Sequence, residues 1–279
     1  MLMTVSYVVL SLEYVFAWGP ERPTYTMEHP ADHAVFNSIT DNAGVGDERD
    51  FVRVVEVRND GEKNTYTNEL EIEAGKDYEV YIYYHNDASE TYNTEEYDYR
   101  GVSRNTRLSA DFPKSLKAGE TGEVVGIISS STATPAEVWD EAKITAKEDV
   151  TLHYVASSAR IYNKWDANES ILSRNMFSQM GTFIGLNELN GTILGCDKYA
   201  GYITYTIHTM KPGEFEAEKA AEQTAQNDAE NAKEDTTSKD LKSDTLTNNT
   251  ENSISPVILV CAGTVVGVVL VKILNSRRK

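Results

Sequence analysis

The chain has 279 residues, with 44 acidic and 26 basic side chains and a formal net charge of -18. We do not expect so acidic a protein to bind nucleic acid, because phosphates are bound by Lys and Arg side chains that displace counterions. Of its two cysteines, Cys261 lies in an apolar segment expected to cross a membrane and Cys196 lies far outside it. No intramolecular disulfide is therefore expected, and Cys196 is either a small buried residue or a thiol for intermolecular pairing.

Residues 1–17 have the pattern of a secretory signal peptide. An apolar stretch is followed by Val15, Phe16 and Ala17, which satisfies the small-residue rule for signal peptidase cleavage. Cleavage after Ala17 would leave Trp18 as the first mature residue. An ordinary buried strand is the alternative, because no Lys or Arg precedes the apolar stretch and Glu13 interrupts it.

Residues 18–210 are predicted to form an all-β extracytoplasmic domain, an Ig-like antiparallel β-sandwich. From residue 24 to 209 the chain is rich in Val, Ile, Thr and Tyr and is punctuated by Gly, Asn, Asp and Pro, which is typical of short strands joined by turns. No long stretch repeats every 3.6 residues, so helices between the strands are not expected. The length allows one large domain or two small ones. The predicted strands are 51–58, 69–72, 78–86, 102–110, 123–129, 143–146, 150–155 and 202–208, and residues 135–141 are predicted as one helical turn.

The clearest strand is the segment of residues 78–86. Alternation places Tyr78, Val80, Ile82 and Tyr84 on the inward face, and Glu79, Tyr81, Tyr83 and His85 on the outward face. If exposed, Tyr81, Tyr83 and His85 form a binding surface, because tyrosines stack on sugars and anchor protein partners. The alternative is that a second sheet, or the tyrosine-rich loop of residues 87–101, covers them.

A candidate calcium site lies in the loop of residues 41–50. Asp41, Asn42, Asp47 and Asp50 supply oxygen atoms of the kind that Ca²⁺ prefers, and the glycines between them permit a tight loop. The spacing is not that of an EF-hand. The alternative is a surface turn rich in Asp and Asn that is closed by an Asp–Arg pair with Arg49.

Several stretches resemble proteins of bacterial surfaces. Residues 78–86 followed by 101–113 resemble the strand, Asn, loop, strand and Pro core of repeated Ig-like domains of the DUF11 type. Residues 18–209 also resemble a group of uncharacterised bacterial surface proteins, through the stretches 18–26, 37–42, 46–52, 135–142 and 195–205. The resemblance implies a secreted or wall-exposed β-domain ahead of a stalk or anchor, and it implies no activity. No LPxTG-like motif precedes residue 254, which favours a membrane anchor over covalent wall attachment.

The composition of residues 211–279 predicts how the β-domain is anchored. Residues 211–253 are an acidic, low-complexity stalk with too few large apolar residues to form a core. Residues 254–274 are predicted to be a transmembrane helix, since about 20 apolar residues at 1.5 Å rise span roughly 30 Å of bilayer. Residues 275–279 form a short basic tail, and basic flanks stay in the cytoplasm, so the N-terminus is expected outside.

These features predict a membrane-anchored surface protein whose β-domain binds an extracellular protein or a glycan, or has a structural role in the envelope. No cofactor is expected, apart from calcium in the loop of residues 41–50. The alternative function is an extracytoplasmic enzyme that acts on wall polysaccharide through a pair of carboxylates.

Overall fold

The computed structural model describes residues 18–58, 65–217 and 219. The predicted signal peptide at residues 1–17, the predicted transmembrane helix at residues 254–274 and most of the predicted stalk lie outside the described residues. Within the described part of the chain, no helix combines the length and the apolar character needed to cross a bilayer.

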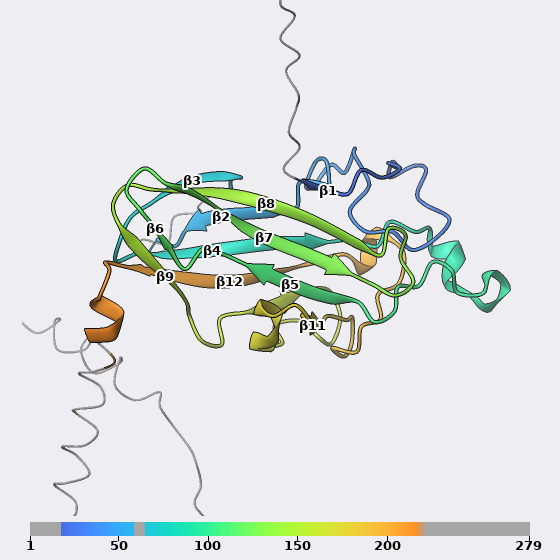
Figure 1. The fold of residues 1–279 in the computed structure, drawn as a ribbon. Helices are drawn as coiled ribbons and strands as arrows, with labels where there is room; N and C mark the ends of the chain where they lie inside the picture. Colours follow the sequence, from blue (N-terminus) through green and yellow to red (C-terminus); the bar gives the residue numbers. More distant parts are fainter. Residues whose placement is uncertain (1–17, 59–64, 218, 220–279) are drawn as a thin grey trace, which may run out of the picture. The chain divides into compact units, whose positions relative to one another are not determined.

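The described residues form two β-sheets that pack face to face (Figure 1). Neighbouring strands are antiparallel, except for β3, which runs parallel to β8. The first sheet has the order β1-β8-β7-β5-β11, with β3 also beside β8, and consists of β1 (Trp18–Gly19), β3 (Glu69–Ile72), β5 (Arg107–Asp111), β7 (Thr121–Ser129), β8 (Glu137–Ala146) and β11 (Thr182–Phe183). The second has the order β2-β4-β12-β9-β6, with β10 also beside β12, and consists of β2 (Val52–Glu56), β4 (Asp77–Tyr84), β6 (Ser115–Leu116), β9 (Val150–Tyr154), β10 (Arg160–Tyr162) and β12 (Gly201–Met210). An all-β, sandwich-like fold is thus confirmed.

The core lies between the two sheets and follows the predicted alternation. Tyr78, Val80, Ile82 and Tyr84 of β4 are each at most 2% exposed, which confirms the inward face of this strand. Gly126 of β7 faces Val52 and Ile82 so closely that an added Cβ would lie 2.8 Å from the Val52 side chain. Burying one large aliphatic side chain of this kind contributes about 1.5–3 kcal/mol.

Most predicted strands are present, but the helical turn predicted at residues 135–141 is wrong. Residues 137–146 form β8, in which Val138, Asp140 and Ala142 alternate with more exposed side chains. Nine residue pairs with β7, from Glu137↔Ser129 onward, hold this segment extended. A full ladder of sheet hydrogen bonds outweighs the weak helical preference of one turn. The short strands β1, β6, β10 and β11 were not predicted.

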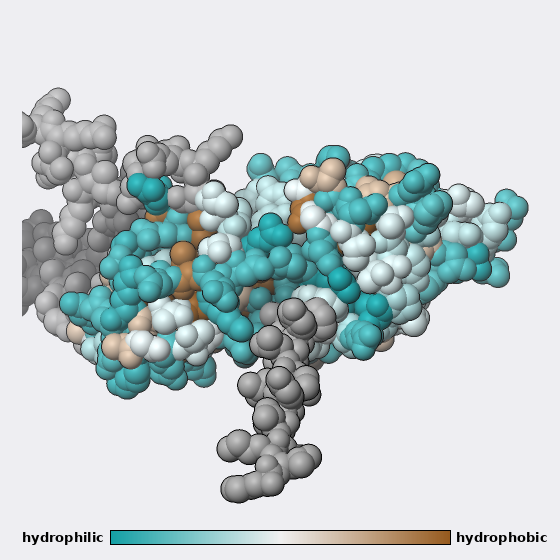
Figure 2. Space-filling view, turned by 90° about the horizontal axis from the view of Figure 1, so that it is seen from above, coloured by the Kyte–Doolittle hydropathy of each residue, from teal (hydrophilic) through white to brown (hydrophobic). Residues whose placement is uncertain are grey.

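The segment of residues 20–48, drawn in blue, lies beside β1, toward the end of the sandwich at which β4 ends (Figure 1). The 3₁₀ turns η1 (Glu90–Asn93) and η2 (Glu95–Tyr97) project from the same end. The surface seen from above in Figure 2 is mostly hydrophilic, with apolar residues visible in small separate areas. This agrees with the acidic composition.

The hydroxyl of Tyr205 is a buried polar group without a hydrogen-bond partner among the described residues. Tyr205 lies fully buried on β12, and burial raises the pKa of its hydroxyl. The substitution Tyr205→Phe is therefore expected to raise the free energy of unfolding by about 1 kcal/mol, because an unsatisfied buried polar group is removed. Urea denaturation of the full-length chain measures the change.

Tyr84→Phe is the matched control for this prediction. The Tyr84 hydroxyl is equally buried but accepts a hydrogen bond of 3.3 Å from Asn163 Nδ2. Its removal should lower the free energy of unfolding by about 1 kcal/mol. Equal losses in both variants would show that the Tyr205 hydroxyl is bound after all.

Candidate functional site

The extended chain continues past the end of β4 and brings three polar side chains to one side. Because side chains alternate in an extended chain, Tyr83, His85 and Asp87 all point away from the core between the sheets. They are nevertheless only 8%, 1% and 0% exposed, respectively. The segment of residues 31–42 covers them and is held by backbone hydrogen bonds, such as Asp87 N–H to Val35 O at 2.9 Å.

Asn37 joins the covering segment to the strand. Its side-chain oxygen accepts the His85 N–H at 2.8 Å, and its side-chain nitrogen donates to Tyr83 O at 3.0 Å. The φ angle of Asn37 is 47°, in the left-handed region that Asn tolerates better than most residues. In this backbone conformation, the Asn37 side chain binds the His85 N–H and the Tyr83 carbonyl, as a neighbouring strand would.

Glu48, His85 and Asp87 form a buried cluster at this junction. His85 Nδ1 lies 3.0 Å from Glu48 Oε1 and 3.1 Å from Asp87 Oδ1, and all three side chains are at most 2% exposed. Glu48 comes from the loop of residues 41–50, whose chain is fixed by its N–H donating to Ile39 O at 2.9 Å. One potential ligand atom from each of the three side chains lies within 4.8 Å of the other two. Among the described residues, these three form the group of His, Cys, Asp or Glu side chains that could hold a metal ion.

The electrostatics of the cluster follow from burial and from the two neighbouring acids. Burial lowers the pKa of His85, but the carboxylates of Asp87 and Glu48 outweigh it and raise this pKa to about 9. Burial raises the pKa of Asp87 well above its usual range, although His85 opposes the change. Two atoms of the cluster, His85 Nε2 and Asp87 Oδ1, have no hydrogen-bond partner among the described residues.

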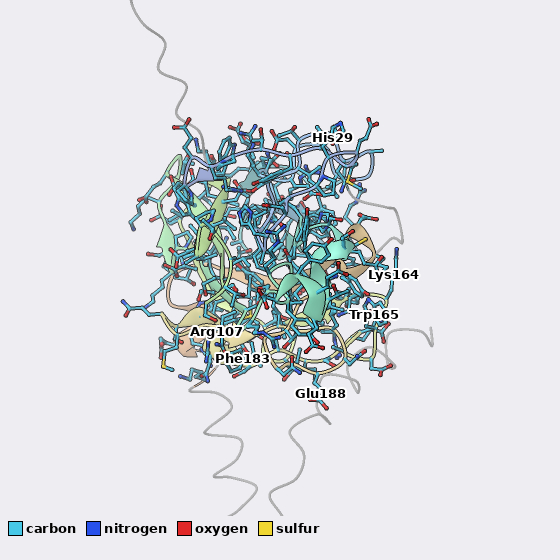
Figure 3. All side chains as sticks on the ribbon, turned by 90° about the vertical axis from the view of Figure 1, so that its right-hand side faces the viewer. His29, Arg107, Lys164, Trp165, Phe183 and Glu188 are labelled. Atoms are coloured by element: carbon cyan, nitrogen blue, oxygen red, sulfur yellow. The ribbon has the colours of Figure 1, made fainter. Side chains whose placement is uncertain are left out.

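A pocket of about 510 Å³ opens beside the cluster on the outer face of the second sheet. Tyr83, Tyr162 and Tyr202 contribute aromatic surface, and the polar side chains that line it are Asn42, Asn163, Lys164, Asn168 and Asp197. Figure 3 shows Lys164 beside Trp165 at this end of the molecule. The Trp165 ring stacks on Tyr199 with centroids 5.1 Å apart, which fixes the loop that forms one wall of the pocket.

Four tyrosine rings form a ladder across the strands next to this pocket. The ring centroids of Tyr66 and Tyr81, of Tyr81 and Tyr202, and of Tyr202 and Tyr162 are 5.0, 5.0 and 4.9 Å apart. Tyr162 and Tyr202 lie directly opposite each other in the pairing of β10 with β12. The ladder holds each ring in place, and Tyr202 remains 36% exposed at the pocket.

A smaller cavity of about 230 Å³ adjoins the cluster. His85 and Asp87 line it together with Cys196, and Asp197 lines both this cavity and the larger pocket. Cys196 is a free thiol of intermediate exposure. His85 and Asp87 therefore face the smaller cavity, and Asp197 connects it with the larger pocket.

Each of the four residues of the predicted calcium loop already has a protein partner, inside or outside the loop. Asp41 accepts the Met27 N–H at 2.8 Å and Asp50 accepts the Asn68 amide at 2.7 Å. Asp47 forms an ion pair with Arg49, as in the alternative interpretation. Asn42 accepts the Gly44 N–H at 2.9 Å and donates to Glu48 Oε1 at 2.5 Å. The structure thus brings Asn42, and not the three aspartates, to the buried cluster.

The three residues of the predicted binding face of β4 lie in different environments. Tyr81 lies half-buried in the tyrosine ladder, whereas Tyr83 and His85 lie beneath Asn37, Asn42 and Glu48. The alternative interpretation expected a cover, but from a second sheet or from the loop of residues 87–101. The cover over Tyr83 and His85 comes instead from the segment that carries Asn37, Asn42 and Glu48. Glu48 and Asp87 were not singled out from the sequence. The spacing of His85 and Asp87 on one face of a strand was the available signal.

Comparisons of the chain with protein-family models, with curated proteins and with solved structures gave no match.

Proposed function

We propose that this chain is a membrane-anchored surface protein whose β-domain binds a glycan in the 510 Å³ pocket beside Tyr162 and Tyr202. The pocket is the observation that carries the proposal, because it joins fixed aromatic rings to a set of amide, carboxylate and ammonium groups. Ligand pockets typically combine an apolar lining with a few placed polar groups.

A sugar ring suits this lining. One face of a pyranose presents C–H groups that pack on an aromatic ring, and its edge presents hydroxyl groups that donate and accept hydrogen bonds. Tyr202 and Tyr162 provide the ring surface, and Asn163, Asn168 and Asp197 provide donors and acceptors. Tyrosine rings already stacked on one another lose little conformational entropy when a ligand binds.

The proposal includes the cellular location of the protein. A signal peptide at residues 1–17, a stalk at residues 211–253 and a helix at residues 254–274 would display the β-domain outside the cell, with the C-terminus in the cytoplasm. An Ig-like topology and a relationship to DUF11-type surface domains, both part of this proposal, would suit adhesion or a structural role in the envelope. The hydrophilic surface suits exposure to solvent.

The buried carboxyl pair of Glu48 and Asp87 is poorly suited to catalysis on polysaccharide. Glycosidases place two carboxyl groups about 5–10 Å apart with the glycosidic bond between them. Glu48 and Asp87 lie on either side of His85 Nδ1, and neither side chain is exposed. A polysaccharide chain has no access to them, so we favour binding over hydrolysis.

The full-length chain, purified in mild detergent, should bind members of a panel of envelope and host-type oligosaccharides. Tyr202→Ala and Tyr162→Ala are expected to weaken binding at least tenfold, about 1.4 kcal/mol, because each removes aromatic surface from the pocket. Isothermal titration calorimetry gives the affinities.

Tyr99→Ala is the matched control. Tyr99 is 44% exposed and does not line the pocket, so its variant should bind like the wild type. The proposal fails if no oligosaccharide binds, or if the pocket variants and Tyr99→Ala bind equally well.

A further inference from the structure

The Glu48–His85–Asp87 cluster buries two carboxyl groups beside one imidazole. In the described part of the chain, no Lys or Arg lies within ion-pairing distance of either carboxylate. Arg22 influences Asp87 through space, but its guanidinium binds Ser38 Oγ and Asn37 O. Two carboxyl groups this close together in a protein interior share a proton, pair with a cation or coordinate a metal.

Two buried polar atoms of this cluster have no hydrogen-bond partner among the described residues. Asp87 Oδ1 is buried, lacks a hydrogen-bond partner and lies 3.1 Å from His85 Nδ1, so it points into the cluster. The other oxygen, Oδ2, accepts the Ser38 N–H. His85 Nε2 is also buried without a partner, on a side chain that lines the 230 Å³ cavity. A buried polar atom without a partner in a native interior is explained by a bound water, by an ion or by a functional role. Of these two atoms, Asp87 Oδ1 is the one placed to share an ion with His85 Nδ1.

The distances match those between ligands of one small cation. Bonds of about 2.0–2.1 Å in a tetrahedron place neighbouring ligand atoms roughly 3.3 Å apart. His85 Nδ1 lies 3.0 and 3.1 Å from the two oxygens of Glu48, and 3.1 Å from Asp87 Oδ1. The ligand atoms of all three side chains lie within 4.8 Å of one another, so one ion that replaces the Nδ1 proton can be reached by all three.

We propose that Glu48, His85 and Asp87 bind one divalent transition-metal ion of the zinc type, with His85 Nδ1 and one oxygen of each acid as ligands. Neighbouring groups orient the ligands: Asn42 Nδ2 donates to Glu48 Oε1 at 2.5 Å, and the Tyr83 hydroxyl lies 3.4 Å from the same atom. Partners of this kind fix the geometry of metal ligands. The adjacent cavity of about 230 Å³ has room for a water molecule in the fourth position.

The ligand set favours zinc over calcium. Ca²⁺ takes six to eight oxygen ligands, whereas Zn²⁺ accepts imidazole nitrogen and carboxylate oxygen in a four-coordinate site. The ion would join the loop that carries Glu48 to the strand extension that carries His85 and Asp87. Asn42 and Tyr83 belong to the same two segments and line the larger pocket, so the ion would stabilise one wall of that pocket.

The test uses the full-length chain after treatment with a chelator and removal of the chelator. Titration with ZnCl₂ should show one ion per chain by calorimetry, and the same ratio should be found by elemental analysis after gel filtration. A ligand that binds the folded state raises the midpoint of thermal unfolding. ZnCl₂ is therefore expected to raise this midpoint, and CaCl₂ at the same concentration is expected to leave it unchanged.

Glu48→Gln and Asp87→Asn should each weaken Zn²⁺ binding at least tenfold. Asp47→Asn is the matched control: it removes the same charge one residue away, from a side chain paired with Arg49, and should bind Zn²⁺ like the wild type. The wild-type measurement stands even if a variant fails to fold. Substoichiometric Zn²⁺ in the wild type, or equal weakening by Asp47→Asn and Glu48→Gln, would overturn the proposal. No glycan enters this experiment, so its failure leaves the glycan proposal intact.

Discussion

Replacing Asp140 by alanine is expected to lower the free energy of unfolding by about 2–5 kcal/mol. Asp140 lies on β8 with its side chain turned into the core and 1% exposed. Its Oδ2 accepts the N–H groups of Phe51 and Val52, at 2.5 and 2.6 Å, from the opposite sheet. Each buried donor that loses its acceptor costs about 1–3 kcal/mol, and alanine removes the acceptor of both. Urea denaturation of the full-length chain, monitored by tryptophan fluorescence, measures the loss.

Asp140→Asn is the informative control, because it keeps a side-chain oxygen at this position. Burial raises the pKa of Asp140 from 3.8 to about 7, although the N–H groups of Val52, Glu141 and Phe51 oppose the change. The folded protein therefore holds a proton there that the unfolded chain has released, and the contribution of Asp140 to stability falls as pH rises from about 4 to about 7. The Asn variant should lack this part of the pH dependence. An identical pH profile in wild type and Asn variant would contradict the assigned shift.

Asp140 also illustrates which parts of the fold the sequence could predict. Long strands such as β4 and β12 alternate clearly between core and surface side chains, so periodicity alone identifies them. Residues 135–141 contain Pro135 and three acids within a few positions, which favours a helix start over a strand. Their extended form depends on pairing with β7, a contact that local propensity does not encode.

The candidate site shows the same division. The loop of residues 41–50 and the outward face of β4 were each identified from residue types, but as separate sites. They meet through Glu48 and His85, which are 37 positions apart in the chain. Glu48 is flanked by Asp, Gly and Arg in a segment with the composition of a surface turn, so the sequence does not predict its burial. The covering segment of residues 31–42 has no strong strand pattern, and its place above His85 depends on isolated bridges such as Phe36↔Asn86.

Tyr84→Ala is expected to lower the free energy of unfolding by about 3–5 kcal/mol, the usual range for truncating a large aromatic side chain in a core. The Tyr84 ring is fully buried, and its hydroxyl meets Asn163 at 3.3 Å. The backbone of Gly201 packs on it so closely that a Cβ there would lie 2.5 Å from the hydroxyl oxygen. Alanine would open a cavity beneath the strands that carry Tyr162 and Tyr202. Chemical denaturation of the full-length chain measures the loss.

Comparison with Tyr84→Phe separates the ring from the hydroxyl. Phenylalanine keeps the packing and loses one hydrogen bond, so a loss of about 1 kcal/mol is expected. Asn163 lines the larger pocket and also donates to Gly185 O at 3.1 Å, which keeps it near its place in this variant. Glycan binding should therefore survive in Tyr84→Phe and weaken in Tyr84→Ala, where the floor of the pocket loses its support. Equal stability losses in the two variants would show that the hydrogen bond, and not the packed ring, supports this end of the sandwich.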